Sequence, residues 1–492
     1  MLVAVQHPAF APPARHAEWA DAALAAARAA GAGFADVRVV EELAESVDVR
    51  DDRVEGVSRT TSRGVGIRVL VDGAWGFAAT NDPSGLRAAA ERAVEIARAS
   101  APLRGEPVRL DDSERPAGTY VTPHGRNPFE VPLAEKIDLL LATAAAGREA
   151  PGIAYVEATT DAWQRTTLYR ASDGAWFDQR VVQVGGGLRG TALGEGELQH
   201  RSWPNSFRGQ FTCGGWEDVV ALDLPGHARP ACDEAVALLI APELPARETT
   251  LLLESSQLAL QVHESVGHPT ELDRILGMER AFAGTSFVTV EDRGRLRYGS
   301  PLVTILADAT TPGALGTFGY DDEGVPAGSA PIVVGGVLEG FLTSRETAAL
   351  LGQSSNGTAR ADSWNAIPLI RMNNVSLQPG DAGTLDDLVA DTDDGVLLAT
   401  NRSWSIDDRR VNFQFGCEAA YEVRHGRLGR LYRNPTYAGR TTEFWGACDA
   451  LGGDWKVWGV PNCGKGQPMQ TARVAHGAPT GRFRGVTTGA RP

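Results

Sequence analysis

The segment Leu258-Ala-Leu-Gln-Val-His263-Glu264-Ser-Val-Gly267-His268-Pro269 places two imidazoles and a carboxylate within an apolar run. Apolar residues at positions 258, 260, 262 and 266 follow two serines, and this pattern predicts a buried helix with a serine cap. Burying histidine and glutamate side chains is costly unless they are paired or bind a metal ion. The segment therefore predicts a metal site, with Glu264 as a general base beside it.

The two histidines are five residues apart, whereas the familiar zinc helix H-E-x-x-H spaces them by four. On a regular α-helix a spacing of five separates the side chains by roughly 140°. Gly267 and Pro269 flank the second histidine, and both residue types disfavour a regular helix. We therefore expect the helix to unwind or bulge at Gly267, which brings His268 back toward His263. The competing interpretation is a pair of unrelated buried histidines.

A catalytic zinc ion usually takes three protein ligands, so a third ligand must come from elsewhere in the chain. The five cysteines are too few and too scattered for a disulfide framework. Cys463 lies in a glycine-rich segment expected to form a tight loop, where Lys465 would help to keep the thiol ionised. Cys448 is a second possibility. Cys417 lies in an alternating run and is expected in a core strand.

Outward from this segment, the N-terminal half alternates helical and strand patterns. An Asp72-Gly73 pair predicts a hairpin, and Asp82-Pro83 predicts the start of a helix. The expected helices cover residues 16–30, 83–99 and 132–148, and the expected strands cover 35–40, 46–50, 65–70, 75–79 and a strand-rich block over 153–210. Residues 101–131 read as a long connection.

Near residue 230 the pattern changes to a helix over 232–240, a β-run over 249–253 and then many glycines and short β-runs. We therefore predict an α+β fold of two domains, a mixed antiparallel sheet with helices over residues 1–235 and a largely β, barrel-like domain over 236–492 that carries the zinc helix.

The composition excludes several classes of protein. A net charge of −15 over 492 residues disfavours a nucleic-acid binder and attachment to an anionic membrane. No segment reaches the roughly 20 apolar residues of a membrane-spanning helix. The cysteine usage favours a reducing compartment, so we expect a cytoplasmic protein.

The run Gly185-Gly-Gly187-Leu-Arg-Gly190 formally matches a dinucleotide-binding fingerprint. That fingerprint requires a helix to open at the glycines, and no helical apolar period follows here. We interpret the run as the glycine-rich end of a strand.

Several motifs in order along the chain resemble the TldD/PmbA family of metallopeptidases. His263 to His268 is similar to the family's H-E-x-x-x-H. The resemblance extends from about residue 16 to about residue 489, and its other motifs are Arg63–Val69, Trp75–Phe77, Gly319–Pro326, Gly335–Leu342, Asn356–Arg360 and Cys463–Gln467. Two features depart from the family pattern: the Cys463–Gln467 segment is one residue shorter, and residues 435–458 are rich in tryptophan.

The resemblance implies that His263, His268 and Cys463 bind zinc and that Glu264 is catalytic. It also implies a homologous partner subunit, similar to TldE or PmbA, that lacks H-E-x-x-x-H and helps to enclose extended or unfolded peptides. Because this chain keeps the complete motif, it resembles the active subunit.

We therefore expect a zinc-dependent peptidase that cleaves extended or unfolded peptides. Two alternatives stay open, namely a zinc hydrolase acting on a non-peptide bond and a non-catalytic scaffold subunit.

Overall fold

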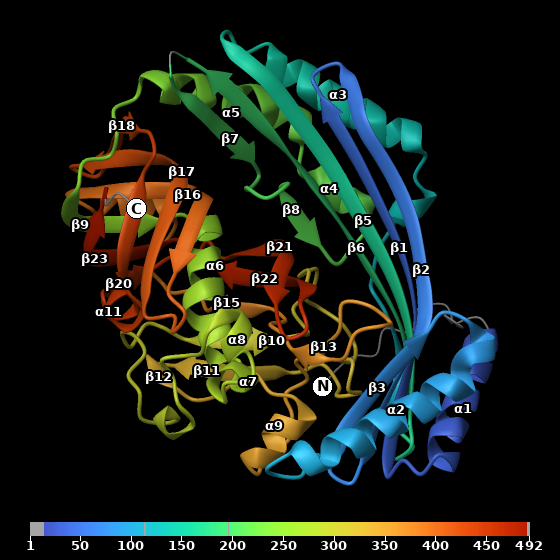
Figure 1. The fold of residues 1–492 in the computed structure, drawn as a ribbon. Helices are drawn as coiled ribbons and strands as arrows, with labels where there is room; N and C mark the ends of the chain where they lie inside the picture. The colour runs from blue at the N-terminus through green and yellow to red at the C-terminus, as the bar shows by residue number, and fades with distance from the viewer. Residues whose placement is uncertain (1–13, 113–114, 195, 490–492) are drawn as a thin grey trace.

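The computed structural model describes residues 14–112, 115–194 and 196–489, and its N-terminal half is built on one long, strongly curved sheet (Figure 1). The strand order is β3-β2-β1-β5-β6-β4, and β7 and β8 also pair with β6. The strands are β1 (Phe34–Arg50), β2 (Arg53–Val71), β3 (Ala74–Thr80), β4 (Ala117–Val121), β5 (Ile153–Ala171), β6 (Trp176–Leu193), β7 (Leu198–Trp203) and β8 (Gln210–Thr212).

The strands are longer than the sequence pattern predicts. The runs 35–40 and 46–50 belong to the single strand β1, which pairs with β2 and with β5 along nearly its whole length. This continuous pairing keeps the polar residues between the two runs in the strand, because strand formation depends on neighbours more than on local composition. The predicted hairpin is confirmed, with Asp72 and Gly73 at φ 50° and 73° between β2 and β3.

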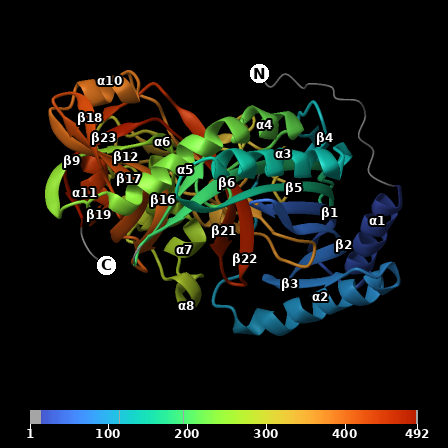
Figure 2. The ribbon, with the colours of Figure 1, turned by 90° about the horizontal axis from the view of Figure 1, so that it is seen from above.

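The helices cover the convex side of this sheet, and the C-terminal half fills its concave side (Figures 1 and 2). The predicted helices are confirmed as α1 (Ala14–Ala29), α2 (Leu86–Ser100), α3 (Leu133–Arg148) and α5 (Leu224–Ile240), and α4 (Trp216–Ala221) precedes α5. A short 3-10 turn precedes α2, where Asp82 accepts a hydrogen bond from the Ser84 N–H as the predicted cap. The connection 101–131 is not wholly irregular, since it contains β4.

The glycine run at 185–190 lies inside β6 rather than at its end, and no helix follows it. A Cβ added to Gly187 would lie 2.5 Å from Gly209 Cα, and one added to Gly190 would lie 2.4 Å from Cys232 Sγ. These glycines therefore allow close packing against the sheet.

The C-terminal half contains a closed five-stranded barrel, which confirms the barrel-like expectation. Its strands pair in the cyclic order β16-β9-β23-β19-β17 and back to β16. They are β9 (Arg247–Leu253), β16 (Asp394–Ile406), β17 (Asn412–Arg424), β19 (Thr436–Arg440) and β23 (Gly481–Thr488), and β18 (Arg427–Tyr432) and β20 (Cys448–Leu451) extend the sheet.

Smaller elements complete the C-terminal half. The short strands are β10 (Ile305–Asp308), β11 (Ser329–Val334), β12 (Val337–Leu338), β13 (Ala359–Arg360), β14 (Leu369–Ile370), β15 (Val375–Leu377), β21 (Lys456–Lys465) and β22 (Gln470–Ala478). The helices are α6 (Ser255–Val262), α7 (Leu272–Ile275), α8 (Arg280–Ala283), α9 (Arg345–Leu350), α10 (Leu385–Ala390) and α11 (Thr441–Gly446).

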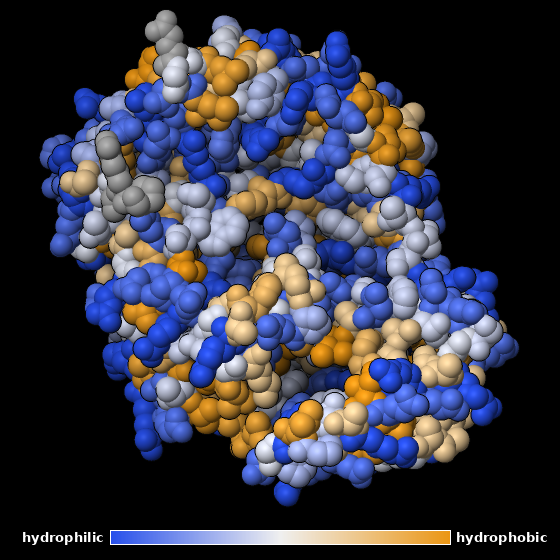
Figure 3. Space-filling view, in the orientation of Figure 1, coloured by the Kyte–Doolittle hydropathy of each residue, from blue (hydrophilic) through white to orange (hydrophobic). Residues whose placement is uncertain are grey.

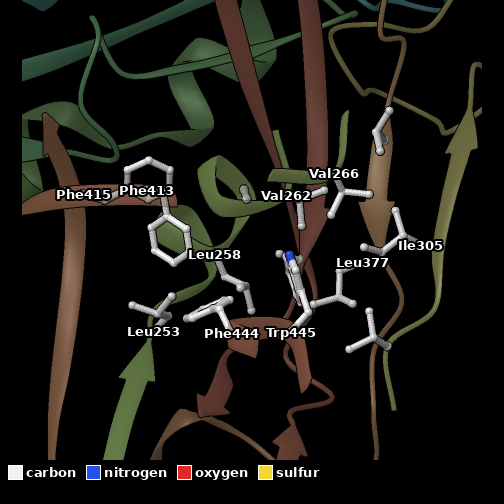
Figure 4. Close-up of a cluster of buried hydrophobic side chains, with 14 of the residues drawn as sticks. Leu253, Leu258, Val262, Val266, Ile305, Leu377, Phe413, Phe415, Phe444 and Trp445 are labelled. Atoms are coloured by element: carbon white, nitrogen blue, oxygen red, sulfur yellow. The ribbon is translucent and has the colours of Figure 1, made fainter. Parts of the chain in front are cut away.

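Helix α6 runs through the largest hydrophobic core, shown in Figure 4. Leu258 and Val262 of this helix are fully buried, and they belong to the same core cluster as Phe413 and Trp445. Side chains from the barrel and from the smaller strands therefore fix the position of the segment that follows α6.

Buried ion pairs join the N-terminal sheet to the C-terminal half. Arg68 of β2 contacts Glu323 at 2.6 Å, and Arg38 of β1 lies 3.3 Å from Asp322. Within the sheet, Arg68 also contacts Asp36 of β1 at 2.5 Å. Removing one partner of such a buried pair is strongly destabilising, because the other charge then lacks compensation. The proposed division after residue 235 falls within α5 and stays a prediction.

Hydrophilic and hydrophobic residues are interspersed on the face shown in Figure 3. Within residues 14–112, 115–194 and 196–489, no helix is both long and apolar enough to cross a membrane.

Candidate metal centre

Helix α6 continues into a π-helical turn, His263–Gly267, and then into a 3-10 turn, His268–Thr270. The His268 N–H donates to the His263 carbonyl, which is the hydrogen bond between residues five apart that defines a π-turn. The two imidazole rings therefore come together, with centroids 4.9 Å apart and planes at 89°. The predicted bulge at Gly267 is confirmed.

The turn is held by buried polar contacts. Trp445 Nε1 donates to Ser265 Oγ at 2.9 Å, and the Tyr298 hydroxyl donates to the Ser265 carbonyl at 2.5 Å. The predicted serine cap is wrong, because Glu254 occupies the cap position. Ser255 lies inside the helix and donates to the Ala478 carbonyl at 2.6 Å, a tertiary contact that the local pattern does not reveal.

Gly267 is expected to be essential to the turn, because a Cβ there would lie 2.0 Å from Met372 Sδ. We expect Gly267→Ala to lower the free energy of unfolding by about 1–3 kcal/mol, as overpacking of a core does. Gly446→Ala is the matched control, since Gly446 is also helical and nothing lies within 4 Å of an added Cβ. Urea denaturation measures both variants, and equal stability of the two would contradict the packing argument.

Cys463 joins the two histidines from a distant part of the chain. One imidazole nitrogen of each histidine and Cys463 Sγ all lie within 4.8 Å of one another, and all three residues are buried. Cys463 lies in strand β21, opposite Ala472 of β22, and not in the predicted loop. Cys448 lies outside the cluster, in β20, and Cys417 lies in the core strand β17 as predicted.

The three side chains suit a zinc ion. Zinc bonds of about 2.0–2.1 Å to nitrogen and about 2.3 Å to sulfur place tetrahedral ligand atoms roughly 3.3–3.7 Å apart. Cys463 Sγ lies 3.8 Å from His268 Nε2, which is close to that separation. Two imidazoles and a thiol are also ligands that zinc commonly takes.

A third histidine orients His263. His263 Nδ1 lies 2.7 Å from His476 Nε2, and His476 Nδ1 lies 2.7 Å from the Val375 carbonyl. A carbonyl oxygen only accepts, so His476 Nδ1 carries a proton, and in neutral His476 the Nε2 atom accepts from His263 Nδ1. This relay leaves the Nε2 lone pair of a neutral His263 free for a metal ion.

A buried carboxylate orients His268 in the same way. His268 Nδ1 lies 3.0 Å from Glu271 Oε2, so His268 Nε2 is the nitrogen that faces Cys463. Metal-binding histidines commonly donate their other N–H to such a partner. Glu271 and His476 were not predicted from the sequence. An acidic residue three positions after His268 is a signal that was available, whereas His476 has no local signal.

The environment favours the ionised thiol. Burial alone would raise the pKa of Cys463, but His263, Arg371 and His268 together hold that pKa well below its usual range. Burial lowers the pKa of His268 well below its ordinary value. Burial also opposes the charged form of His263, yet the neighbouring Cys463 thiolate leaves the pKa of His263 raised.

Lys465 does not have the predicted role. Its ammonium group lies 2.8 Å from Asp273 Oδ1 and 3.3 Å from Glu271 Oε2. A cationic group that does contact the Cys463 backbone is Arg371, whose guanidinium donates to the Cys463 carbonyl. Lys465 therefore contacts Glu271, the carboxylate that in turn contacts His268.

Glu264 lines the same pocket as the three candidate ligands, a cavity of about 250 Å³. Its Oε2 atom lies 2.6 Å from Arg410 Nη1. Arg410 has φ 63°, a conformation that is rare for a side chain of this size and is often found at functional sites. The pocket thus combines a carboxylate, a guanidinium and three candidate metal ligands.

Comparison with known protein families gives matches along most of the chain. Residues 35–97 match the model of PmbA/TldA metallopeptidase domain 1, residues 126–239 the central domain and residues 246–490 the C-terminal domain.

The chain is similar to a metalloprotease of Methanothermobacter thermautotrophicus, with 28% identity over 93% of this chain and 95% of the relative. It is also 27% identical to a zinc metalloprotease TldD homolog of Saccharolobus solfataricus, over 48% of this chain and 50% of that relative.

Two solved structures share the fold. A putative modulator of DNA gyrase from Thermotoga maritima has a TM-score of 0.76 at 16% identity, covering 96% of this chain and 99% of that one. TldE from Thermococcus kodakarensis has a TM-score of 0.69 at 15% identity, covering 96% of this chain and 100% of that one.

Proposed function

The chain belongs to the PmbA/TldD metallopeptidase family, and from this premise we propose that it is a zinc-dependent peptidase that cleaves extended or unfolded peptides. His263, His268 and Cys463 are the proposed zinc ligands, and Glu264 is the proposed general base. The observation that carries the proposal is the convergence of these four buried side chains on one pocket.

The choice of zinc rests on the ligand chemistry and on one relative. Two imidazoles and a thiolate form a ligand set that leaves a fourth position open, as catalytic zinc sites do. A TldD homolog from Saccharolobus solfataricus carries the name zinc metalloprotease. When bound, zinc would supply Lewis acidity at the bond to be cleaved.

In this proposal, Glu264 is the residue that moves protons. It would accept a proton from the attacking water and later donate it to the leaving amine, as a general acid–base residue does. Arg410 holds one carboxylate oxygen at 2.6 Å, so it fixes the orientation of Glu264 in the pocket. Charge-assisted hydrogen bonds of this kind are short and directional.

A homologous partner is part of the proposal. The chain shares its fold with TldE from Thermococcus kodakarensis, and the family resemblance implies that the active subunit pairs with a related chain. We propose that such a partner encloses the pocket around an extended peptide, while the catalytic residues come from this chain.

The experiment loads the full chain with zinc and incubates it with an unfolded protein, alone and together with a homologue that lacks H-E-x-x-x-H. Mass spectrometry of the products and zinc content per chain are measured. We expect one zinc ion per chain and peptide fragments that disappear when a chelator is added. Bound zinc with intact substrate under both conditions would contradict the peptidase proposal and would favour a scaffold role.

The hydrogen bond between His263 and His476 predicts the effect of replacing His476, which is not itself a proposed zinc ligand. His476→Phe removes the acceptor for His263 Nδ1, so we expect zinc affinity to fall by about 10–100-fold. Competition with a chelator measures the affinity, and His425→Phe is the control, since His425 is exposed. Equal zinc affinity in the two variants would remove His476 from the proposed centre.

A further inference from the structure

Two aromatic side chains on the wall of the metal pocket are exposed. Phe207 and Trp404 both line the pocket, with 38% and 44% of their surface exposed. Their ring centroids lie 5.3 Å apart at an interplanar angle of 83°, an edge-to-face contact. Leu260 and Trp458 line the same pocket, so it has an apolar side beside its catalytic groups.

The loop that carries Phe207 is held in a rare backbone conformation. Phe207 and Arg208 have φ 54° and 74°, values that large side chains seldom adopt. Arg208 fixes the loop to the N-terminal sheet, with contacts of 2.7 Å to both Asp48 and Asp161. A backbone kept in such a conformation while it exposes an apolar ring indicates a function for the ring, because folding alone favours burial.

Phe207, which contacts Trp404, lies where two cavities meet. Phe207 and Asn401 line both the metal pocket and a neighbouring cavity of about 570 Å³. Charged residues of the N-terminal sheet line this second cavity, among them Arg50, Glu157 and Arg189. A peptide that extends through the polar cavity toward Glu264 therefore passes the aromatic pair.

We propose that Phe207 and Trp404 form a binding site for a large apolar side chain of the peptide, on a residue close to the bond that is cleaved. This inference rests on the proposed peptidase function and names its substrate class. Aromatic walls bind such a side chain through buried apolar area and edge-to-face contacts. The larger cavity is lined by both positive and negative side chains, so it does not favour peptides of one charge. The apolar side chain is therefore the main feature by which a peptide is selected. Arg208 is a positioning residue, since it acts through the loop.

The test uses unstructured peptides that differ at one position, with Phe, Leu, Ala or Glu placed in turn at the three residues on either side of the cleaved bond. We expect wild-type kcat/KM to be at least about 10-fold higher for Phe than for Ala at one of these positions, as one apolar side chain allows. Phe207→Ala and Trp404→Ala are each expected to reduce this ratio to below about 3. Trp176→Ala is the matched control, because Trp176 is a partly exposed tryptophan of β6 that contacts Arg170 and lies outside the pocket.

Arg208→Lys and Arg208→Ala separate positioning from simple loss of stability. We expect Arg208→Ala to lower the Phe/Ala ratio through KM, and Arg208→Lys to recover part of it. A uniform fall in activity toward all peptides, with the ratio unchanged, would contradict this role for Arg208.

A binding measurement keeps this inference separate from the peptidase proposal. Zinc-loaded Glu264→Gln protein is titrated with the same peptides, and fluorescence anisotropy gives their affinities. A Phe/Ala preference that depends on Phe207 and Trp404 supports the site even where no peptide is cleaved. Cleavage by the wild type with a ratio that neither aromatic substitution changes would overturn the inference and leave the peptidase proposal intact. A protein that neither binds nor cleaves any peptide would overturn both.

Discussion

The Glu264→Gln protein is expected to keep its zinc ion, while its kcat/KM for peptide cleavage falls by about 10²–10⁴-fold. This is the contribution of a positioned general base. Glutamine has nearly the shape of glutamate, and its amide cannot accept the proton of the attacking water at neutral pH. Glu264 is not among the three candidate ligands, so its replacement removes no ligand atom from the site. The measurement is kcat/KM on an unfolded substrate, with zinc content determined on the same preparation.

The control for this substitution is Glu291→Gln, since Glu291 is an exposed glutamate of the C-terminal half outside the pocket. It is expected to retain wild-type activity. A Glu264→Gln protein with activity within about threefold of this control would remove Glu264 from the mechanism. A variant that lost both zinc and activity would instead assign Glu264 a role in holding the centre.

The bend between the two histidines could be predicted because its cause is local. Gly267 and Pro269 interrupt the helix at the position where a five-residue spacing requires it, and the structure realises this as a π-turn. The contact that makes glycine necessary, with Met372, comes from a residue more than 100 positions away. The bend at Gly267 could therefore be predicted from the sequence, but its packing against Met372 could not.

The third candidate ligand was not determined by local pattern. The residues left both Cys463 and Cys448 open as the third ligand, although the glycine-rich segment and Lys465 favoured Cys463 modestly. The pairing of β21 with β22 brings Cys463 to the histidines, and β20 pairs instead with β23. Such pairings are long-range, so the choice of Cys463 rested mainly on the family resemblance before the fold was known.

The same limit applies to the contacts of Phe207 and of residues 321–323, which the sequence alone does not predict. Phe207 lies in a loop with no periodic pattern, and it meets Trp404 because the N-terminal sheet packs against the barrel. The segment Asp321-Asp322-Glu323 was noticed only as a family motif. In the structure Asp322 and Glu323 contact Arg38 and Arg68 of the N-terminal sheet, so the motif also joins the two halves.

Cys463→Ala is expected to weaken zinc binding on the order of a thousandfold. A zinc site of four ligands is worth about 10–16 kcal/mol in small zinc domains, so one thiolate carries a large share of the affinity. The same loss is expected to abolish the stabilisation that zinc gives to the folded chain, which is about 4 kcal/mol when free zinc is 1,000 times its Kd. Chelator competition measures the affinity, and thermal unfolding with and without zinc measures the stabilisation.

Cys448→Ala separates metal binding from packing, because Cys448 is also a buried cysteine of the C-terminal half and lies outside the metal cluster. Each substitution removes one sulfur from the same hydrophobic core, so both variants are expected to lose similar stability in the absence of zinc. Only Cys448→Ala should regain stability when zinc is added. If zinc stabilises both variants equally, Cys463 is a core cysteine, and the two histidines need a different third ligand. If zinc stabilises neither variant, zinc binding depends on the packing of both β20 and β21. In that case β20 helps to support the metal centre.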